Sequence, residues 1–143
     1  MNRLEFLFPN LTKVGYKITS SEANFYNCIA WAAGENNRWW EPDPMDQLYW
    51  PPNVPRENTL NAYVKAFESL GYASCTTVDC ENGFEKIALY VDQKNIPTHA
   101  AKQLSDGKWT SKLGALEDIS HNSLEALTNS DYGRVGPILK RPI

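Results

Sequence analysis

Cys28 is the residue whose type and setting point most directly to chemistry. It stands at the start of the segment CIAWAAG, where small and apolar residues predict a short buried helix that Asn27 caps and Gly34 ends. A thiol in the first turn of a helix lies at the positive end of the helix dipole, which lowers its pKa and favours the nucleophilic thiolate. The alternative interpretation is packing, because free cysteines are among the most buried residues.

His99 is the candidate partner of this thiol. It is one of two histidines in the chain, and it follows Pro97 and Thr98 at the opening of a predicted strand over residues 99–104. A nearby imidazole lowers the pKa of a thiol and carries its proton to a leaving group. We therefore expect Cys28 and His99 to meet at the end of a sheet, as nucleophile and general base.

The elements that position this pair are helices followed by strands. The apolar residues of segment 59–70 recur at helical spacing, and Gly71 ends that helix. Strands are predicted over 72–78, 84–91, 99–104 and 108–113, and a short helix over 123–128. This order predicts an α+β fold, in which N-terminal helices pack on a small antiparallel β-sheet.

The remaining segments are predicted to be less regular. Residues 1–22 are expected to form an irregular arm with one short extended piece, and the tail that ends at Ile143 is expected to be extended. The pair Asn82-Gly83 favours a tight turn, so the first two predicted strands are expected to form a hairpin.

Composition restricts the class of protein. With 143 residues, of which 42% are hydrophobic, the chain is expected to form one domain over 1–143. A net charge of −3 without a basic block argues against nucleic acid as a partner. The sequence has no apolar run long enough for a membrane helix and no signal-peptide layout at its N-terminus. We expect a cytoplasmic protein, or one exported by a route that needs no signal peptide.

The chain has three cysteines, an odd number that argues against a disulfide framework. Cys75 and Cys80 are expected to be free thiols. A zinc site built from these two cysteines with His99 and His121 is conceivable, but the chain has no second close pair of ligands. We therefore expect neither a metal nor a cofactor.

At the level of order and spacing, residues 24–114 resemble the papain-like cysteine hydrolases. The segment YNCIAWA resembles their nucleophile helix, and THAAKQLSDGKWTS resembles their histidine strand and the strand that follows it. The resemblance is greatest to the compact branch, the bacterial cell-wall endopeptidases and amidases. It implies a papain-like core and a peptide or protein substrate.

In that family a third polar residue on the following strand orients the imidazole. The usual spacing places Ser111 there, where the family more often has His, Asn, Gln or an acid. Asp118 is an alternative, because a carboxylate fixes the tautomer of the imidazole and stabilises the imidazolium. Both residues remain candidates. Lys112 either binds a substrate carboxylate or is a solvated residue at the edge of the sheet.

Other residues are candidates for binding. The resemblance implies an oxyanion site made by the backbone N–H of Cys28 and a side-chain amide of Asn24 or Asn27, although Asn27 is equally suited to capping the helix. The proline-rich segment 35–58 is expected to be a loop. Its residues Trp39, Trp40 and Trp50 either attach that loop to the core or form a recognition surface.

The leading hypothesis is a cysteine hydrolase, a peptidase or amidase that acts on an amide or isopeptide bond. The same centre would also support acyl transfer or deamidation of glutamine, and the resemblance is compatible with a toxin or effector. The alternatives are a non-catalytic binding module on the same fold, with the tryptophan-rich loop as its surface, and an immunity or inhibitor protein with a cognate protein partner.

Overall fold

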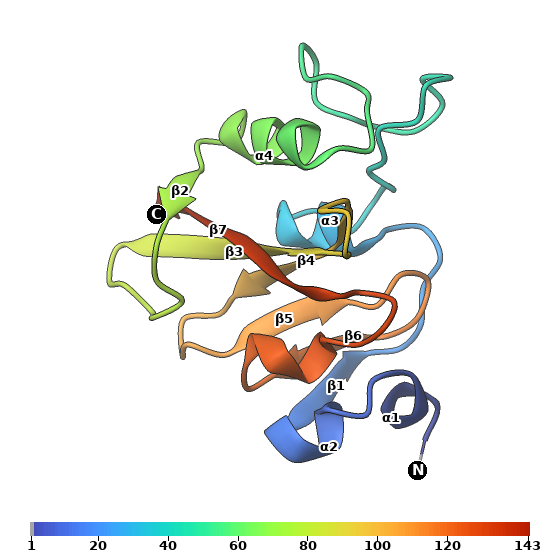
Figure 1. The fold of residues 1–143 in the computed structure, drawn as a ribbon, viewed down its shortest axis with the longest axis vertical. Helices are drawn as coiled ribbons and strands as arrows, with labels where there is room; N and C mark the ends of the chain where they lie inside the picture. Colours follow the sequence, from blue (N-terminus) through green and yellow to red (C-terminus); the bar gives the residue numbers. More distant parts are fainter. Residues whose placement is uncertain (1) are drawn as a thin grey trace.

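The computed structural model describes residues 2–143 and is built around one antiparallel sheet (Figure 1). The sheet has seven strands in the order β1-β6-β5-β4-β3-β7-β2. The strands are β1 (Tyr16–Ser20), β2 (Ala73–Cys75), β3 (Phe84–Val91), β4 (Pro97–Gln103), β5 (Trp109–Lys112), β6 (Asp118–His121) and β7 (Arg134–Pro142).

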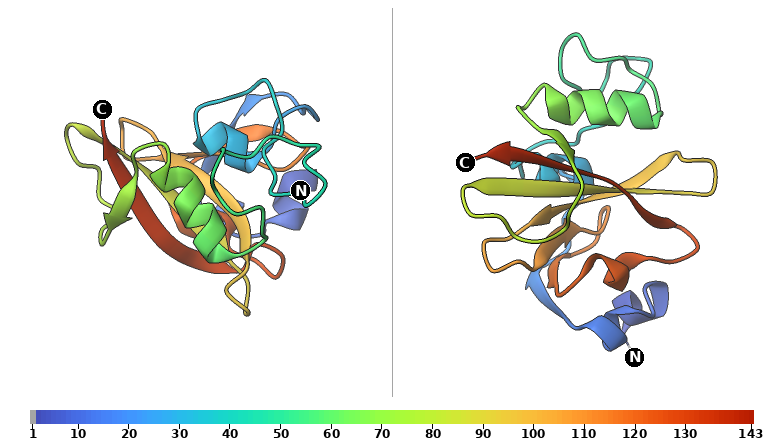
Figure 2. Two further views of the ribbon diagram at one scale, coloured as in Figure 1. Left: turned by 90° about the horizontal axis from the view of Figure 1, so that it is seen from above. Right: turned by 60° about the vertical axis from the view of Figure 1, so that its left-hand side comes forward.

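Short helices cover the sheet. They are α1 (Arg3–Leu7), α2 (Leu11–Val14), α3 (Cys28–Ala32), α4 (Leu60–Glu68) and the 3₁₀ helix η1 (Leu124–Leu127). Figures 1 and 2 show α4 at one end of the molecule, with α1 and α2 beside the N-terminus at the other end. The loop between α3 and α4 lies at the same end as α4.

The core consists of two apolar clusters, one on each face of the sheet. On the first face, side chains of α3, α4 and the long loop pack on Ile87, Leu89 and Ala100. On the second face, side chains of α1, α2 and η1 pack on residues that include Tyr90 and Ala101. The alternation of side chains along β3 and β4 produces these two faces, because successive residues of a strand point to opposite sides.

The predicted α+β class is confirmed, but the sheet is larger than predicted and the helices against it are short. The strand predicted over 84–91 is present with the same bounds. The arm over residues 1–22 is more regular than predicted, because it contains α1, α2 and β1. Strand β1 is held in the sheet by pairing with β6, a strand that was not predicted.

The predicted hairpin between the first two strands is wrong. Strand β2 pairs with β7, and β7 lies between β2 and β3. The Asn82-Gly83 turn is present, with Gly83 at a φ of 84°, but it leads β3 alongside the C-terminal strand. The tail therefore completes the sheet by pairing on both of its sides.

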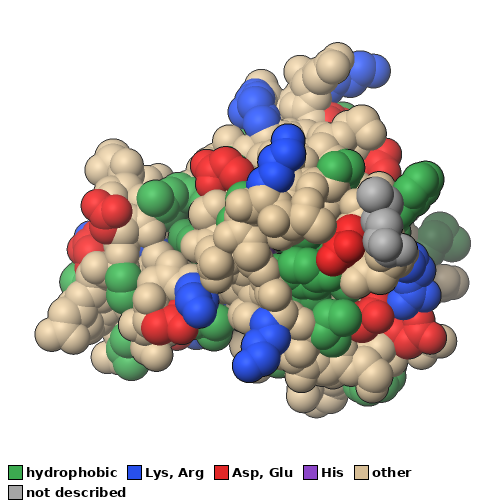
Figure 3. Space-filling model, turned by 90° about the horizontal axis from the view of Figure 1, so that it is seen from below, with side chains coloured by type: hydrophobic (Ala, Val, Ile, Leu, Met, Phe, Trp, Pro, Cys, Tyr) green, Lys and Arg blue, Asp and Glu red, His purple; other side chains and the backbone are tan. Residues whose placement is uncertain are grey.

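The surface carries charges of both signs. In Figure 3, acidic and basic side chains are interspersed over the face seen from below, with apolar side chains between them. Neither histidine is exposed, since both are fully buried. Among residues 2–143, no helix is long and apolar enough to span a bilayer.

Candidate functional site

Cys28 is the first residue of α3 and lies in a hollow of about 260 Å³ on the first face of the sheet. Its side chain is half-buried and packs against the cluster beneath α3. Four of the eleven residues that line this hollow, which we call the Cys28 hollow, are aromatic. Its lining residues are Asn27, Cys28, Ile29, Trp39, Trp40, Glu41, Tyr63, Pro97, Thr98, Gly114 and Tyr132.

The thiol of Cys28 is protonated at neutral pH. Burial raises its pKa to about 11, because the apolar surroundings disfavour the thiolate. The backbone N–H groups of Ala100, Ile29 and Cys28 itself, and the more distant charge of Lys112, act in the opposite direction but are weaker. The sequence predicted that the helix start would lower the pKa of this thiol. The structure shows the opposite, because the effect of burial exceeds that of the five-residue helix.

His99 is fully buried in β4. Its ring stacks on Tyr132, with centroids 4.4 Å apart and planes at 14°, and meets the ring of Tyr90 edge-on at 5.2 Å. Within residues 2–143, neither ring nitrogen of His99 has a hydrogen-bond partner. Burial lowers the pKa of the imidazole well below its usual value, with the charge of His121 acting in the same direction.

The structure does not join Cys28 and His99 by a hydrogen bond. His99 pairs with Tyr90 across the sheet and shares the second face with it, whereas Ala100 faces the cluster beneath α3. The thiol is in contact with the β4 backbone at Ala100, so the strand itself lies between the thiol and the imidazole. Tyr132 is the residue that reaches both, because it stacks on His99 and lines the Cys28 hollow.

Ser111 is hydrogen-bonded to the other histidine, His121. Its hydroxyl lies 2.8 Å from Nε2 of His121, and Nδ1 of that ring lies 2.9 Å from the carbonyl oxygen of Ser123. A carbonyl can only accept, so Nδ1 carries the proton and Nε2 accepts from Ser111. Burial lowers the pKa of His121 to about 4, which keeps this ring neutral.

Asp118 is also occupied elsewhere, on the first face of the sheet. Its carboxylate accepts hydrogen bonds from the hydroxyls of Thr19 and Tyr26. Neither predicted orienting residue therefore contacts His99 in this structure.

Lys112 is neither a solvated edge residue nor free to bind a substrate carboxylate. Its side chain is fully buried, and its ammonium donates to the carbonyl oxygens of Ala23 and Gly114. Burial lowers its pKa, and the charge of Asp118 opposes that effect. Its hydrogen bonds fix the backbone at Ala23 and at Gly114, and Gly114 lines the Cys28 hollow.

The two asparagines differ in their setting. Asn27 caps α3, because its Oδ1 accepts from the backbone N–H of Ala30, and its amide also binds the backbone of Trp40. Both ends of this amide are used, so it is not a free oxyanion donor. Asn24 is exposed and does not line the Cys28 hollow.

Replacing Asn27 by Ala is expected to destabilise the protein by about 2 kcal/mol. The substitution removes a helix cap and leaves the buried backbone N–H and C=O of Trp40 without partners. Urea unfolding followed by tryptophan fluorescence measures the change. Thr59→Ala, which removes the cap of α4 without touching the hollow, is the matched control and is expected to cost about 1 kcal/mol. Equal losses of stability in the two variants would contradict the role of Asn27 in holding the backbone of Trp40.

The tryptophans divide between the two predicted roles. Trp50 is buried, donates to the carbonyl oxygen of Pro55 and packs edge-on against Tyr63, so it attaches the loop to the core. Trp39 and Trp40 line the Cys28 hollow, although Trp40 is 2% exposed. Of the three tryptophans, only Trp39 and Trp40 therefore remain candidates for a recognition surface.

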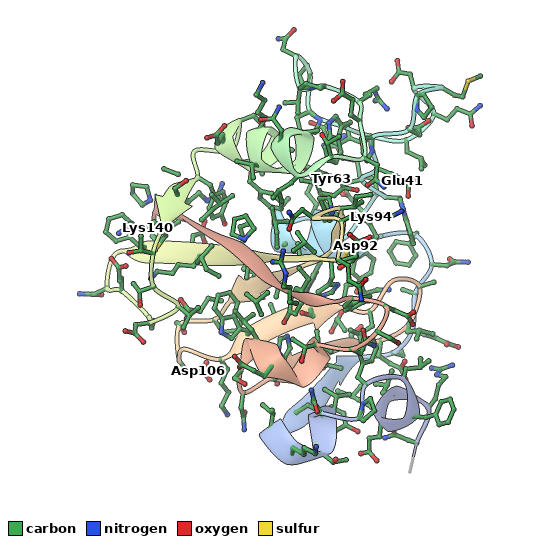
Figure 4. All side chains as sticks on the ribbon, in the orientation of Figure 1. Glu41, Tyr63, Asp92, Lys94, Asp106 and Lys140 are labelled. Atoms are coloured by element: carbon green, nitrogen blue, oxygen red, sulfur yellow. The ribbon has the colours of Figure 1, made fainter. Side chains whose placement is uncertain are left out.

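Several residues of the Cys28 hollow were not predicted as site residues from the sequence, among them Glu41, Tyr63 and Tyr132. Figure 4 labels Glu41 and Tyr63, which come from the long loop and from α4 and lie beside one another. Tyr63 belongs to the apolar stripe of α4, where a core role is the ordinary expectation. Tyr132 stands in a turn with no motif, so the sequence contained no signal for it.

The two remaining cysteines, Cys75 and Cys80, are free thiols, as predicted. In the part of the chain that the structure describes, no group of three or more His, Cys, Asp or Glu side chains is arranged to hold a metal ion.

Comparison with protein families gives one match. Residues 17–140 match a family described as a domain of unknown function, DUF7689. The chain belongs to this family. No curated protein and no solved structure matches the chain. The DUF7689 region contains every candidate site residue and leaves out α1 and α2, so the Cys28 hollow lies entirely within the family's domain.

Proposed function

We propose that the protein is a cysteine hydrolase that acts on an amide bond of a peptide or protein, with Cys28 as its nucleophile. The observation that supports this proposal most is the contrast between its two buried imidazoles. His121 has a partner on each ring nitrogen, as a structural histidine does, and His99 has none. A buried polar group without a partner costs free energy, and such groups persist where function requires them.

The surroundings of the thiol also support the proposal. Cys28 is half-buried in an aromatic hollow, whereas a cysteine that only packs is usually enclosed. The hydroxyls of Tyr63 and Tyr132 have no hydrogen-bond partner within the described chain. Burial raises the pKa of both hydroxyls, and ionisation of Cys28 would raise it further. Both hydroxyls thus remain protonated donors close to the thiol.

In the proposed reaction, the sulfur of Cys28 attacks the amide carbonyl carbon while the thiol proton passes to a ring nitrogen of His99. The negative oxygen that results accepts hydrogen bonds from the backbone N–H of Cys28 and from the tyrosine hydroxyls. The C–N bond then breaks, and the leaving amine takes the proton from His99. Water attacks the thioester, gives its proton to His99 and releases the acid, and the thiol is restored.

This reaction requires a rearrangement around Tyr132. The imidazole must come within hydrogen-bond distance of the sulfur, and Tyr132 is stacked on it in the resting structure. The raised pKa of Cys28 and the lowered pKa of His99 both favour the neutral pair, which is the resting form before a substrate enters.

Trapping of the acyl-enzyme tests the proposal. The protein is incubated with p-nitrophenyl acetate and with a library of peptidyl aminomethylcoumarins, quenched in acid and mapped by mass spectrometry. We expect an acyl adduct on Cys28 that is absent in Cys28→Ala and forms at least about 100-fold more slowly in His99→Gln, the usual effect of losing a general base.

His121→Gln is the matched imidazole control, since His121 has both nitrogens occupied; its acylation rate is expected to stay within about threefold of wild type. Near-UV circular dichroism confirms that each variant is folded. No adduct with any probe, an adduct on Cys75 or Cys80 instead, or a wild-type rate in His99→Gln would contradict the proposal.

A non-catalytic binding module is the second candidate. The observation that favours it is the separation of Cys28 from His99 by the backbone of β4, together with a thiol whose pKa is raised to about 11. In that case the aromatic hollow binds a ligand, and Cys28→Ala leaves the affinity unchanged.

A further inference from the structure

The walls of the Cys28 hollow point to the chemical class of the group that it binds. Four of its lining residues are aromatic: Trp39, Trp40, Tyr63 and Tyr132. Aromatic rings attract cations through their negative faces, and several rings around one hollow are the usual recognition site for alkylammonium groups.

A carboxylate stands at the edge of these rings. Glu41 lines the Cys28 hollow and also a neighbouring hollow of about 360 Å³, which shares Tyr63 with it. Its side chain is exposed, and among residues 2–143 it has no ion-pair partner. The charge of Glu41 acts on the Tyr63 hydroxyl, which places the two groups close together (Figure 4).

The backbone holds Glu41 in place. Its N–H donates to the carbonyl oxygen of Tyr49 at 3.0 Å, beside the bridge between Trp40 and Tyr49. The amide of Asn27 also holds the backbone of Trp40. The backbone that carries the Glu41 carboxylate is therefore fixed by hydrogen bonds, next to the proposed nucleophile Cys28.

The neighbouring charges leave this carboxylate uncompensated. No lysine or arginine is among the described residues that line either hollow. Asp43, the other acidic lining residue, is paired with Arg56 at 2.9 Å. The buried Lys112 is held by two carbonyl oxygens and faces Asp118. An approaching cation is thus attracted by Glu41 without a competing internal partner.

We propose that this hollow binds an alkylammonium group, with the aromatic rings around the cation and Glu41 as its counter-ion. Resting on the proposed function, this inference names the substrate class as an amide whose neighbouring side chain carries an alkylammonium. A lysine-type primary ammonium and a quaternary methylated ammonium share this chemistry.

Binding of small cations to the unmodified protein tests the proposal without any need for turnover. The probes are n-butylammonium and choline, each compared with its neutral counterpart, n-butanol and 3,3-dimethyl-1-butanol. Binding is followed in ¹H–¹⁵N spectra through the indole N–H signals of the five tryptophans. We expect at least one cation to bind about tenfold more tightly than its neutral counterpart, with the largest shifts at Trp39 and Trp40.

Glu41→Gln is expected to weaken this binding at least about fivefold, because it removes the counter-ion. Glu68→Gln is the matched control: it removes the same charge from an exposed residue of α4 that lines neither hollow, and binding should be unchanged. Preference for butylammonium would identify a lysine-type group, and preference for choline a methylated one.

Equal affinity for cations and neutral counterparts, or an unchanged affinity in Glu41→Gln, would overturn the inference. Its failure is distinguishable from failure of the proposed function. If cations still bind to Cys28→Ala and no acyl adduct forms in the wild type, the ammonium site is supported and the proposed hydrolase function is contradicted. If an acyl adduct forms on Cys28 without any preference for cationic substrates, the hydrolase function is supported and the ammonium site is contradicted.

Discussion

Gly133→Ala is expected to destabilise the protein by about 4 kcal/mol. Gly133 has a φ of 76°, which costs a residue with a Cβ about 1–2 kcal/mol. A Cβ at this position would also lie 2.1 Å from the carbonyl oxygen of Val91, so β3 or the turn that carries Tyr132 has to shift. Overpacking of this kind adds about 1–3 kcal/mol.

Gly71→Ala separates these two effects. Its φ is 96°, yet a Cβ there would meet nothing within 4 Å, so the variant carries the backbone cost alone. Urea unfolding of both variants measures the difference. We expect Gly71→Ala to lose about 1–2 kcal/mol and Gly133→Ala about 1–3 kcal/mol more. Similar losses would show that the turn at Tyr132 adapts freely, and that Tyr132 is not firmly held against His99.

Local signals in the sequence predict the elements around Cys28 well. Asn27 caps α3 and the apolar stripe of α4 is buried, since each of these features depends on residues a few positions apart. Strand 84–91 is equally local, because it contains the apolar run from Ile87 to Val91 and is bounded by Gly83 and Asp92.

The topology of the sheet is not a local property. The Asn82-Gly83 turn is compatible with a hairpin, and only the pairing of Phe84 with Pro142 shows that β7 takes the place beside β3. That pairing joins residues 58 positions apart, and no periodicity within either segment encodes it. The sequence predicts only a short extended piece in the region of β1 and no strand at β6. Both strands are short, and their pairing joins segments that are distant in the sequence.

The face that a side chain occupies is the most sensitive property of all. Successive residues of a strand point to opposite faces of the sheet. The order of Cys28 and His99 in the sequence therefore could not determine whether their side chains face each other. The pairing of His99 with Tyr90 places its ring on the η1 side, while Ala100 faces α3. The sequence therefore makes both residues candidates but does not predict the strand backbone between them.

The two buried histidines are expected to make folding strongly pH-dependent between pH 7 and 5. Burial lowers the pKa of His121 from 6.5 to about 4, so this ring is neutral in the folded protein and protonated in the unfolded chain at pH 5, and burial lowers the pKa of His99 well below 6.5 in the same direction. The unfolded state binds more protons, and stability falls as the pH falls. Above the unfolded pKa of 6.5 this contribution is fully present.

The lowered pKa of His121 removes about 2 kcal/mol of stability between pH 7 and 5, at about 1.4 kcal/mol per pH unit below 6.5, and the lowered pKa of His99 removes stability in the same direction. Carboxylates contribute little in this window, because Glu81, whose pKa is lowered to about 2, and the other acids titrate in the unfolded chain near 4.5. Urea unfolding at half-unit steps measures the slope.

His121→Gln is expected to reduce this slope without abolishing it, whatever it does to stability at pH 7, because it leaves His99 as the sole titrating imidazole. The remaining slope then reports on His99 alone. A flat profile in His121→Gln would mean that His99 keeps an ordinary pKa in the folded protein. The imidazole would then be exposed to water or paired, and the unpartnered ring on which the proposed catalytic role depends would not exist.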